Sequence, residues 1–301
     1  GGQNSSLAGF QSASFGNPDA RWETTNTTNI GIEATILDNL NITLDVWERN
    51  TYDMLYQVSV PSVEGVADIP SRNIGKMKNL GFDLSLRYRG DALNGDFSYD
   101  ISSNISSYKN EIQKLSGEAG EFIQGANFRQ IFYTRAEKGT EFPEFYGYIV
   151  KGIFQTEEEA ANHPPAFGED GTYNKPGHFK YKDVNGDGVI NDDDRTYIGS
   201  PHPDFTAGLS AQFQYKGFDL DMDFYGVYGR DLINYVSRWI NFRNFQGNRS
   251  KARLYESWGS PYLDNNENAT LPICESSDMG SQRPSTFFLE DGSYLRLKRL
   301  Q

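Results

Sequence analysis

Residues 29–46 decide the fold: Asn-Ile-Gly-Ile-Glu-Ala-Thr-Ile-Leu-Asp-Asn-Leu-Asn-Ile-Thr-Leu-Asp-Val. Apolar and polar side chains alternate along both halves of this stretch, and Asp38-Asn39 separates the halves. The apolar set is Ile30, Ile32, Ala34 and Ile36, followed by Leu40, Ile42, Leu44 and Val46. Because successive side chains of a strand point to opposite faces, a period of two predicts an antiparallel hairpin with one apolar face.

The same alternation recurs four more times along the chain. It is found at residues 80–89, 97–102, 205–213 and 218–225. Strands of about nine to eleven residues are long enough to cross a bilayer at a tilt. An antiparallel sheet with one face on a soluble core would show the same alternation, so periodicity alone does not separate the two interpretations.

The lengths of the connections favour a membrane barrel. Short links are expected at 37–39, 90–95 and 216–217, and long ones at 50–78, 106–203 and 228–292. Short and long links fall at opposite ends of the strand pairs, as in outer-membrane barrels with tight periplasmic turns and long extracellular loops. A structureless excursion of that length is uncommon in a compact soluble domain.

Composition narrows the function classes. The net charge is −13 and the pI about 4.7, which excludes a nucleic-acid partner because no basic face can neutralise phosphates. Aromatic residues make up 14% of the chain while mean hydropathy is −0.64, a combination typical of a barrel with a polar lumen and aromatic girdles. Cys274 is the single cysteine, so no internal disulfide is possible.

The polar rows of the predicted strands carry charges. They include Glu33, Asp45, Asp83, Asp219, Asp221 and Asp223. Charges facing lipid are costly, so we expect these side chains to line water or a plugging domain. No carboxylate pair is accompanied by a histidine partner or a nucleophile motif, and the sequence predicts no catalytic residue and no enzyme activity.

Residues 183–194, Asp-Val-Asn-Gly-Asp-Gly-Val-Ile-Asn-Asp-Asp-Asp, match a twelve-residue calcium loop. The predicted metal ligands are Asp183, Asn185, Asp187, the carbonyl of Val189 and, at the closing position, Asp194. Gly188 permits the sharp turn, and Ile190 supplies an apolar anchor. The alternative is a metal-free surface turn rich in Asn, Asp and Gly. We therefore predict a structural calcium ion in an extracellular loop, with no catalytic role.

Several blocks of sequence, taken in chain order, resemble the SusC/RagA family of TonB-linked outer-membrane transporters. They are Asn17–Thr25 leading to Asn29-Ile30-Gly31, Asn73–Phe82, Tyr146–Tyr148 with Gly152–Gln155, Tyr181–Gly188 running on to Pro203-Asp204-Phe205, Phe224–Gly229, and Phe288–Lys298. The resemblance covers nearly the whole chain.

The resemblance implies an all-β fold, part of an antiparallel transmembrane barrel of about 22 strands with a plugged lumen and long extracellular loops. It implies import of oligosaccharides, or in some members peptides, across the outer membrane of Bacteroidota. A SusD-like surface lipoprotein would cap the barrel, and TonB would supply energy. Residues 1–301 are then expected to be a C-terminal portion of the barrel, truncated at both ends, without the plug and the TonB-contacting region.

Aromatic faces that stack on sugar rings are the usual means of gripping glycans, and the long loops are rich in them. Substrate contact is predicted for Tyr235, Trp239, Arg243 and Trp258. The same aromatics could instead form an interfacial girdle or pack against the lipoprotein.

Two alternatives from other classes remain open at this point. One is a soluble, calcium-stabilised β-sandwich that binds glycans as a lectin or adhesin, in which the apolar rows would meet in a core. The other is a secreted glycoside hydrolase. The transport interpretation requires that the apolar rows face lipid and the charged rows face a wet interior.

Overall fold

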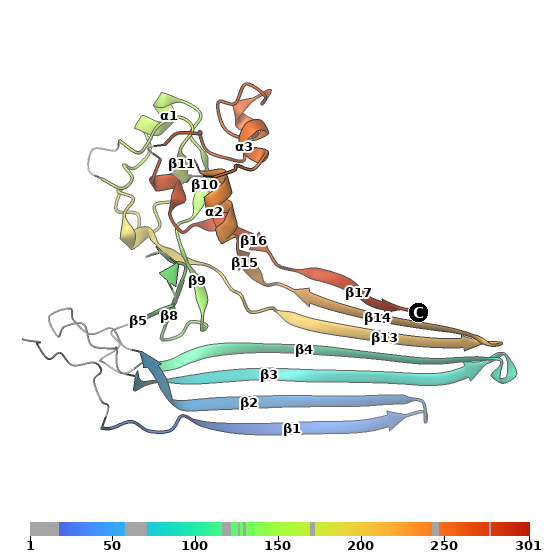
Figure 1. The fold of residues 1–301 in the computed structure, drawn as a ribbon. Coiled ribbons are helices and arrows are strands. Elements are labelled where there is room, and N and C mark those ends of the chain that lie inside the picture. The colour runs from blue at the N-terminus through green and yellow to red at the C-terminus, as the bar shows by residue number, and fades with distance from the viewer. Residues whose placement is uncertain are drawn as a thin grey trace, which may run out of the picture.

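The computed structural model describes residues 18–57, 71–115, 122–125, 127–128, 131–168, 172–242, 247–276 and 278–301. Seven antiparallel strands form one sheet in the order β1-β2-β3-β4-β13-β14-β17 (Figure 1). Their bounds are β1 Thr24–Ile36, β2 Leu40–Gln57, β3 Ser71–Ala92, β4 Phe97–Leu115, β13 Phe205–Tyr215, β14 Phe218–Tyr228 and β17 Tyr294–Leu300. Strands β4 and β13 are neighbours although a long connection separates them in sequence.

The register places the apolar rows of all seven strands on one face. Ile30 pairs with Val46, and Val46 with Phe82; further along, the row Ile105, Ala207, Gly226 and Leu295 continues across β4, β13, β14 and β17. Nothing in the described chain covers this face: Ile30 is 71% exposed and Leu295 77%. The apolar rows therefore do not meet in a core, which excludes the β-sandwich alternative.

The opposite face is polar, and its side chains bond across strands. The Trp47 indole donates to Asp83 at 2.8 Å, and Ser106 donates to the other oxygen of the same carboxylate at 2.5 Å. Arg87 and Asp100 form an ion pair at 2.5 Å. As predicted, the charged row and the apolar row lie on different faces.

The short links all lie at one end of the sheet and the long connections at the other (Figure 1). The tight turn between β1 and β2 places Leu37 and Asp38 at φ of 52° and 57°, and the turn between β13 and β14 places Lys216 at 46° and Gly217 at 85°. Both central residues of each turn thus have the positive φ of a type I′ hairpin.

The predicted connection at 50–78 was wrong in its bounds, because β2 continues to Gln57 and β3 begins at Ser71. The apolar row stops at Val46 on β2. The next residue on that face, Glu48, forms an ion pair with Lys78 at 2.7 Å. Backbone pairing needs no apolar face, so the ladder continues where the outer row has become charged.

The connection from β4 to β13 and the connection from β14 to β17 fold together beyond the long-loop end of the sheet, and we call their described residues the lobe (Figure 1). Its strands are β5 Phe122–Gln124, β6 Asn127–Phe128, β7 Ile131–Phe132, β8 Thr134–Glu137, β9 Glu144–Gly147, β10 Val150–Ile153, β11 Phe179–Tyr181, β12 Thr196–Gly199, β15 Asp231–Ile233 and β16 Leu289–Asp291. Its α-helices are α1 Glu157–Ala161, α2 Tyr235–Asn241 and α3 Ala252–Tyr255, and its 3-10 helices are Asp192–Asp194, Asn266–Asn268, Gly280–Gln282 and Thr286–Phe288. None of the helices in the described residues is long and apolar enough to cross a membrane.

A hydrophobic core holds the lobe together. Its buried members are Tyr148, Ile153, Ala166, Phe179, Tyr181, Ile190, Phe242 and Phe288. They come from both long connections, so each connection depends on the other for its core. An isolated parallel β-bridge between Tyr148 and Ser285 joins the backbones of the two connections.

Candidate functional site

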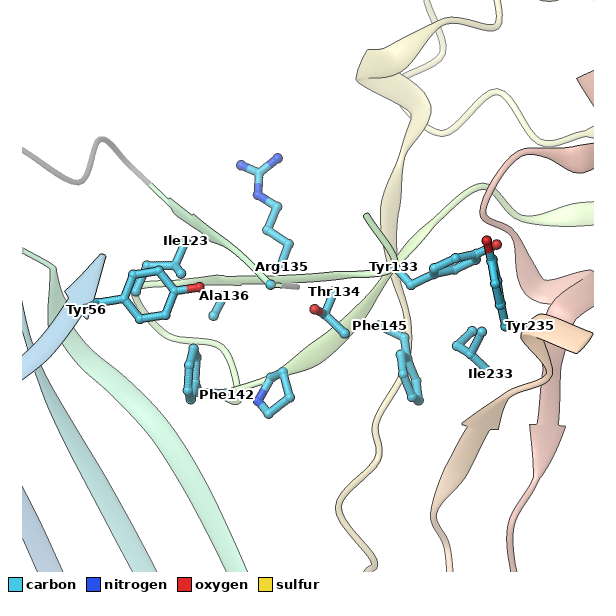
Figure 2. Close-up of a pocket in the computed structure, with 12 residues that line it drawn as sticks. Tyr56, Ile123, Tyr133, Thr134, Arg135, Ala136, Phe142, Phe145, Ile233 and Tyr235 are labelled. Carbon is cyan, nitrogen blue, oxygen red and sulfur yellow. The ribbon is translucent and has the colours of Figure 1, made fainter. Parts of the chain in front are cut away.

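A cavity of about 410 Å³ lies where the lobe meets the long-loop end of β2 (Figure 2). Apolar and aromatic side chains make up most of its wall. They include Tyr56, Ile123, Tyr133, Phe142, Phe145, Ile233 and Tyr235. This size and lining are typical of a site for a small organic group.

The sheet and one long connection build the first side of the cavity. Tyr56 lies at the end of β2, and its hydroxyl donates to the carbonyl of Gln124 at 2.8 Å. Its ring meets Phe142 edge-on at 6.3 Å, and both pack against buried Ile123. The end of the sheet is thereby tied to the lobe.

The second side combines the two long connections. The rings of Tyr133 and Tyr235 lie 5.8 Å apart in an edge-to-face contact, with their hydroxyls directed toward the same point (Figure 2). Tyr235 is the first residue of α2, whose N-cap Asn234 accepts from Ser237 N at 2.9 Å. Burial raises the pKa of Tyr133. A hydrogen bond to Arg238 and the positive charge of Arg238 lower this pKa, but burial has the larger effect. The Tyr133 hydroxyl therefore stays protonated at neutral pH and can donate a hydrogen bond.

Arg135 also borders the cavity, but its charge is engaged elsewhere. Its guanidinium lies 3.9 Å from the ring centre of Phe122 and 4.7 Å from that of Tyr146, and it pairs with Glu137 at 3.0 Å. In Figure 2 its side chain runs away from the rings of Tyr56 and Phe142. The cavity therefore offers aromatic faces and hydroxyls in place of charge.

The four residues predicted for substrate contact lie in different settings. Tyr235 lines the cavity, and Trp239 packs against the ring of Tyr235 with ring centres 5.8 Å apart. Trp258 is partly buried against the core of the lobe and donates its indole N–H to Gln155 at 2.9 Å. Arg243 lies outside the described residues.

Sequence analysis missed the other cavity residues, Tyr133, Phe142 and Phe145. They belong to short strands and turns with no alternation to mark them. The available signal was the density of aromatics between residues 122 and 148.

The predicted calcium loop folds around its own carboxylates. Asp183 accepts from the backbone N–H groups of Gly186 and Gly188 at 2.6 and 2.9 Å. Gly186 and Gly188 both have positive φ, at 75° and 85°. Ile190 is fully buried in the lobe core, as expected of an apolar anchor.

The closing residue of that loop bonds to the backbone of the loop. Asp194 is fully buried, and its two carboxylate oxygens accept from Val184 N at 2.7 Å and Asn191 N at 2.8 Å. Within the described ranges, no group of three or more His, Cys, Asp or Glu side chains is arranged to hold a metal ion. The oxygens of Asp183, Asn185 and Asp187 are gathered in one exposed turn and fit the first half of a calcium site.

The comparisons with known proteins agree on one family. The profile of the family described as "TonB dependent receptor-like, beta-barrel" matches residues 2–130. TonB-dependent receptor P3 of Formosa agariphila is 31% identical over 95% of this chain and 27% of its own length. TonB-dependent receptor SusC of Bacteroides thetaiotaomicron is 28% identical over 93% of this chain and 26% of its own.

A solved structure described as the RagAB peptide transporter superposes with a TM-score of 0.72 at 27% identity. It covers 95% of this chain, and this chain covers 29% of it. The chain thus spans roughly a quarter of the length of the curated relatives it matches. These relatives are named as receptors and transporters, and they are proteins of the outer membrane. The apolar face of the sheet is accordingly the lipid-facing side of a barrel wall, and the chain belongs to the SusC/RagA family of TonB-dependent outer-membrane proteins, as part of its β-barrel.

Proposed function

We propose that the protein imports oligosaccharides or peptides across the outer membrane, as the barrel subunit of a complex with a SusD-like surface lipoprotein. TonB would energise the transport. The tyrosine-lined cavity at the base of the lobe carries the proposal, because it places aromatic faces and hydroxyls where the barrel wall meets the extracellular loops.

Aromatic cavities suit both substrate classes. Sugar rings stack on tyrosine faces and accept hydrogen bonds from tyrosine hydroxyls, and apolar amino-acid side chains fill the same kind of space. The chain is similar both to SusC and to a peptide transporter, so we propose both oligosaccharides and peptides as substrate classes.

A deletion strain tests the proposal and separates the classes. We expect it to lose growth on one polysaccharide or on one peptide mixture as sole nutrient, while growth on monosaccharides and amino acids is unchanged. Complementation with a Tyr235→Ala variant should restore growth only in part, because this tyrosine lines the cavity. Unchanged growth of the deletion strain on every polymer would reject the import function.

The lipoprotein partner has its own test. A tagged copy of the protein, purified from outer membranes in mild detergent, should retain a surface lipoprotein in equal amount. Purification of the barrel protein alone, with the lipoprotein left in the membrane fraction, would contradict the complex.

We also propose that calcium stabilises the loop at residues 183–194. Asp183, Asn185 and Asp187 would supply side-chain oxygens, the Val189 carbonyl a further ligand, and Asp194 would close the site. Calcium should raise the unfolding temperature of the lobe and slow its proteolysis, and a chelator should reverse both. The Asp187→Ala variant should not respond. Equal behaviour of both proteins with and without calcium would exclude the ion.

A further inference from the structure

A second cavity of the lobe, of about 300 Å³, is lined by arginines. Arg195, Arg238 and Arg283 all contribute to its wall, together with Phe132 and Gln282. They come from three separate parts of the two long connections, so the fold and not the local sequence brings them together. In a chain of net charge −13, this gathering of cations stands out.

Hydrogen bonds to backbone carbonyls hold the guanidinium groups of Arg195 and Arg238. Arg195 donates to the carbonyl of Phe132 at 3.2 Å and lies 4.9 Å from the ring centre of Tyr146. Arg238 donates to the carbonyl of Gln282 at 2.9 Å. All three side chains are half-buried. A guanidinium carries five N–H donors, and the bond of Arg195 to the Phe132 carbonyl uses one of them.

A carboxylate lies beside Arg283, one of these arginines. Asp192 is 3.8 Å from Arg283 and accepts a hydrogen bond from Tyr148 at 2.7 Å. Its side chain is 81% exposed, and that of Arg283 is 40% exposed. Arg283 also lies over the ring of Phe167 at 4.0 Å, which orients its guanidinium.

The arginine cavity adjoins the tyrosine cavity. The chain passes from Ile131 and Phe132, which line the first, to Tyr133 and Thr134, which line the second. Helix α2 likewise presents Tyr235 to one cavity and Arg238 to the other, one turn apart. A molecule held against the tyrosines would therefore have the arginines close by.

We propose that the arginine cavity binds a carboxylate group of the imported substrate, an inference that rests on the proposed import function. Arginine forks match the two oxygens of a carboxylate, and such charge-assisted bonds strengthen where water is partly excluded. The carboxylate could belong to a uronic acid of an oligosaccharide or to an acidic peptide. The shared chemistry is a carboxylate beside a group that fits an aromatic cavity.

Binding to the full-length protein, purified in detergent with any partner it retains, tests this. The probes are an oligogalacturonate and its methyl ester, and an acidic hexapeptide and its Asn/Gln counterpart, each titrated by calorimetry. We expect one acid to bind at least about tenfold more tightly than its neutral counterpart, and less tightly as salt rises. Which acid binds identifies the source of the carboxylate.

Variants locate the effect. Arg283→Gln and Arg195→Gln should each weaken binding of the acid by about tenfold or more and leave the neutral probe unaffected. Arg283→Lys, which keeps the charge but loses the fork, should retain part of the affinity. Lys251→Gln removes an exposed cation of the lobe outside the cavity and should have no effect. Unchanged amide exchange across the lobe core shows that each variant is folded.

Equal affinity for acid and neutral probes, no binding of either acid, or full acid affinity in the arginine variants would each overturn the assignment. The import function has a separate test. A protein that supports growth on a polymer but shows no preference for carboxylates loses only the present inference.

Discussion

The sheet and the lobe use aromatic and aliphatic side chains in opposite ways. In the sheet, Phe218 is 78% exposed on the face that meets lipid, whereas Phe288 in the lobe is fully buried. The lipid-facing rows need only be apolar, because the bilayer adapts its shape to them. The lobe stands in water and must pack its own side chains against one another. The same residue types must therefore fit closely against one another in the lobe, whereas in the sheet they need only be apolar enough to face lipid.

The largest expected effect separates these two requirements with one kind of substitution. Phe288→Ala should lower the free energy of unfolding of the lobe by about 3–5 kcal/mol, because it leaves a cavity beside Phe242 and Phe287. Phe218→Ala should leave that free energy unchanged. Denaturant titrations followed by tryptophan fluorescence measure both. Similar losses in the two variants would mean that the lobe has no specific core of its own.

A charge placed on each face of one strand tests the sheet. Leu209→Arg puts a cation on the lipid-facing row of β13, and we expect a cost of about 2–4 kcal/mol in folding into vesicles. Gln212→Arg puts the same cation on the polar row and should be tolerated. Heat-modifiable mobility on gels after folding into vesicles reports the difference. A larger defect for Gln212→Arg would reverse the two faces.

Two glycines give a smaller contrast. A methyl group on Gly147 would lie 2.5 Å from the carbonyl oxygen of Pro284, whereas one on Gly226 would lie 3.4 Å from that of Tyr294. Gly147→Ala should destabilise the lobe by about 1–3 kcal/mol, since backbone must shift to admit the methyl group. Gly226→Ala in the sheet should have little effect on folding. Unfolding of each variant in denaturant would show whether close backbone contact restricts the size of the side chain in the lobe but not in the sheet.

The smallest expected effect is a pH dependence confined to the lobe. Partial burial opposes ionisation of Glu275, but hydrogen bonds from Lys175 and His178 outweigh it and hold its pKa below the ordinary 4.5. The His178 ring nitrogen lies 2.5 Å from this carboxylate, and the Lys175 ammonium 2.9 Å. Because the pKa is lower in the folded state, the contribution to stability is complete above the ordinary pKa and is lost as pH falls through the lowered value.

Glu275→Gln should flatten this acid-induced loss of lobe stability and leave folding of the sheet unaltered. Amide exchange at a series of pH values from neutrality to below the ordinary pKa of 4.5 measures both regions in one experiment. Identical pH profiles for the variant and the original protein would show that the pair does not contribute.

The sequence predicted the sheet well because side-chain period and turn chemistry are local. Alternation predicted the hairpin of residues 29–46 and the tight turns at one end. It also predicted that Asp83 and Phe82 lie on opposite faces of the sheet. The strand ends were not, because β2 and β3 continue past Glu48 and Lys78, where apolar alternation stops but backbone pairing does not.

The candidate sites were predictable only in part. The turn at 183–194 was predictable because its residues are close in sequence, and the structure confirms the positive φ of Gly188 and the burial of Ile190. Calcium binding there and substrate contact by Tyr235 stay predictions. Trp258 looked equivalent to Tyr235 in sequence, yet it lies against the lobe core, partly buried, and its indole bonds to Gln155.

By itself, then, the sequence determined the strands, their faces and the kind of solvent each face meets, because a period of two needs no knowledge of distant residues. Only the tertiary structure decided that Tyr133 lies beside Tyr235 and that Arg195, Arg238 and Arg283 line one cavity. Those contacts join residues from separate connections. They form because each connection lacks a core until the other packs against it, and no local pattern records that partnership.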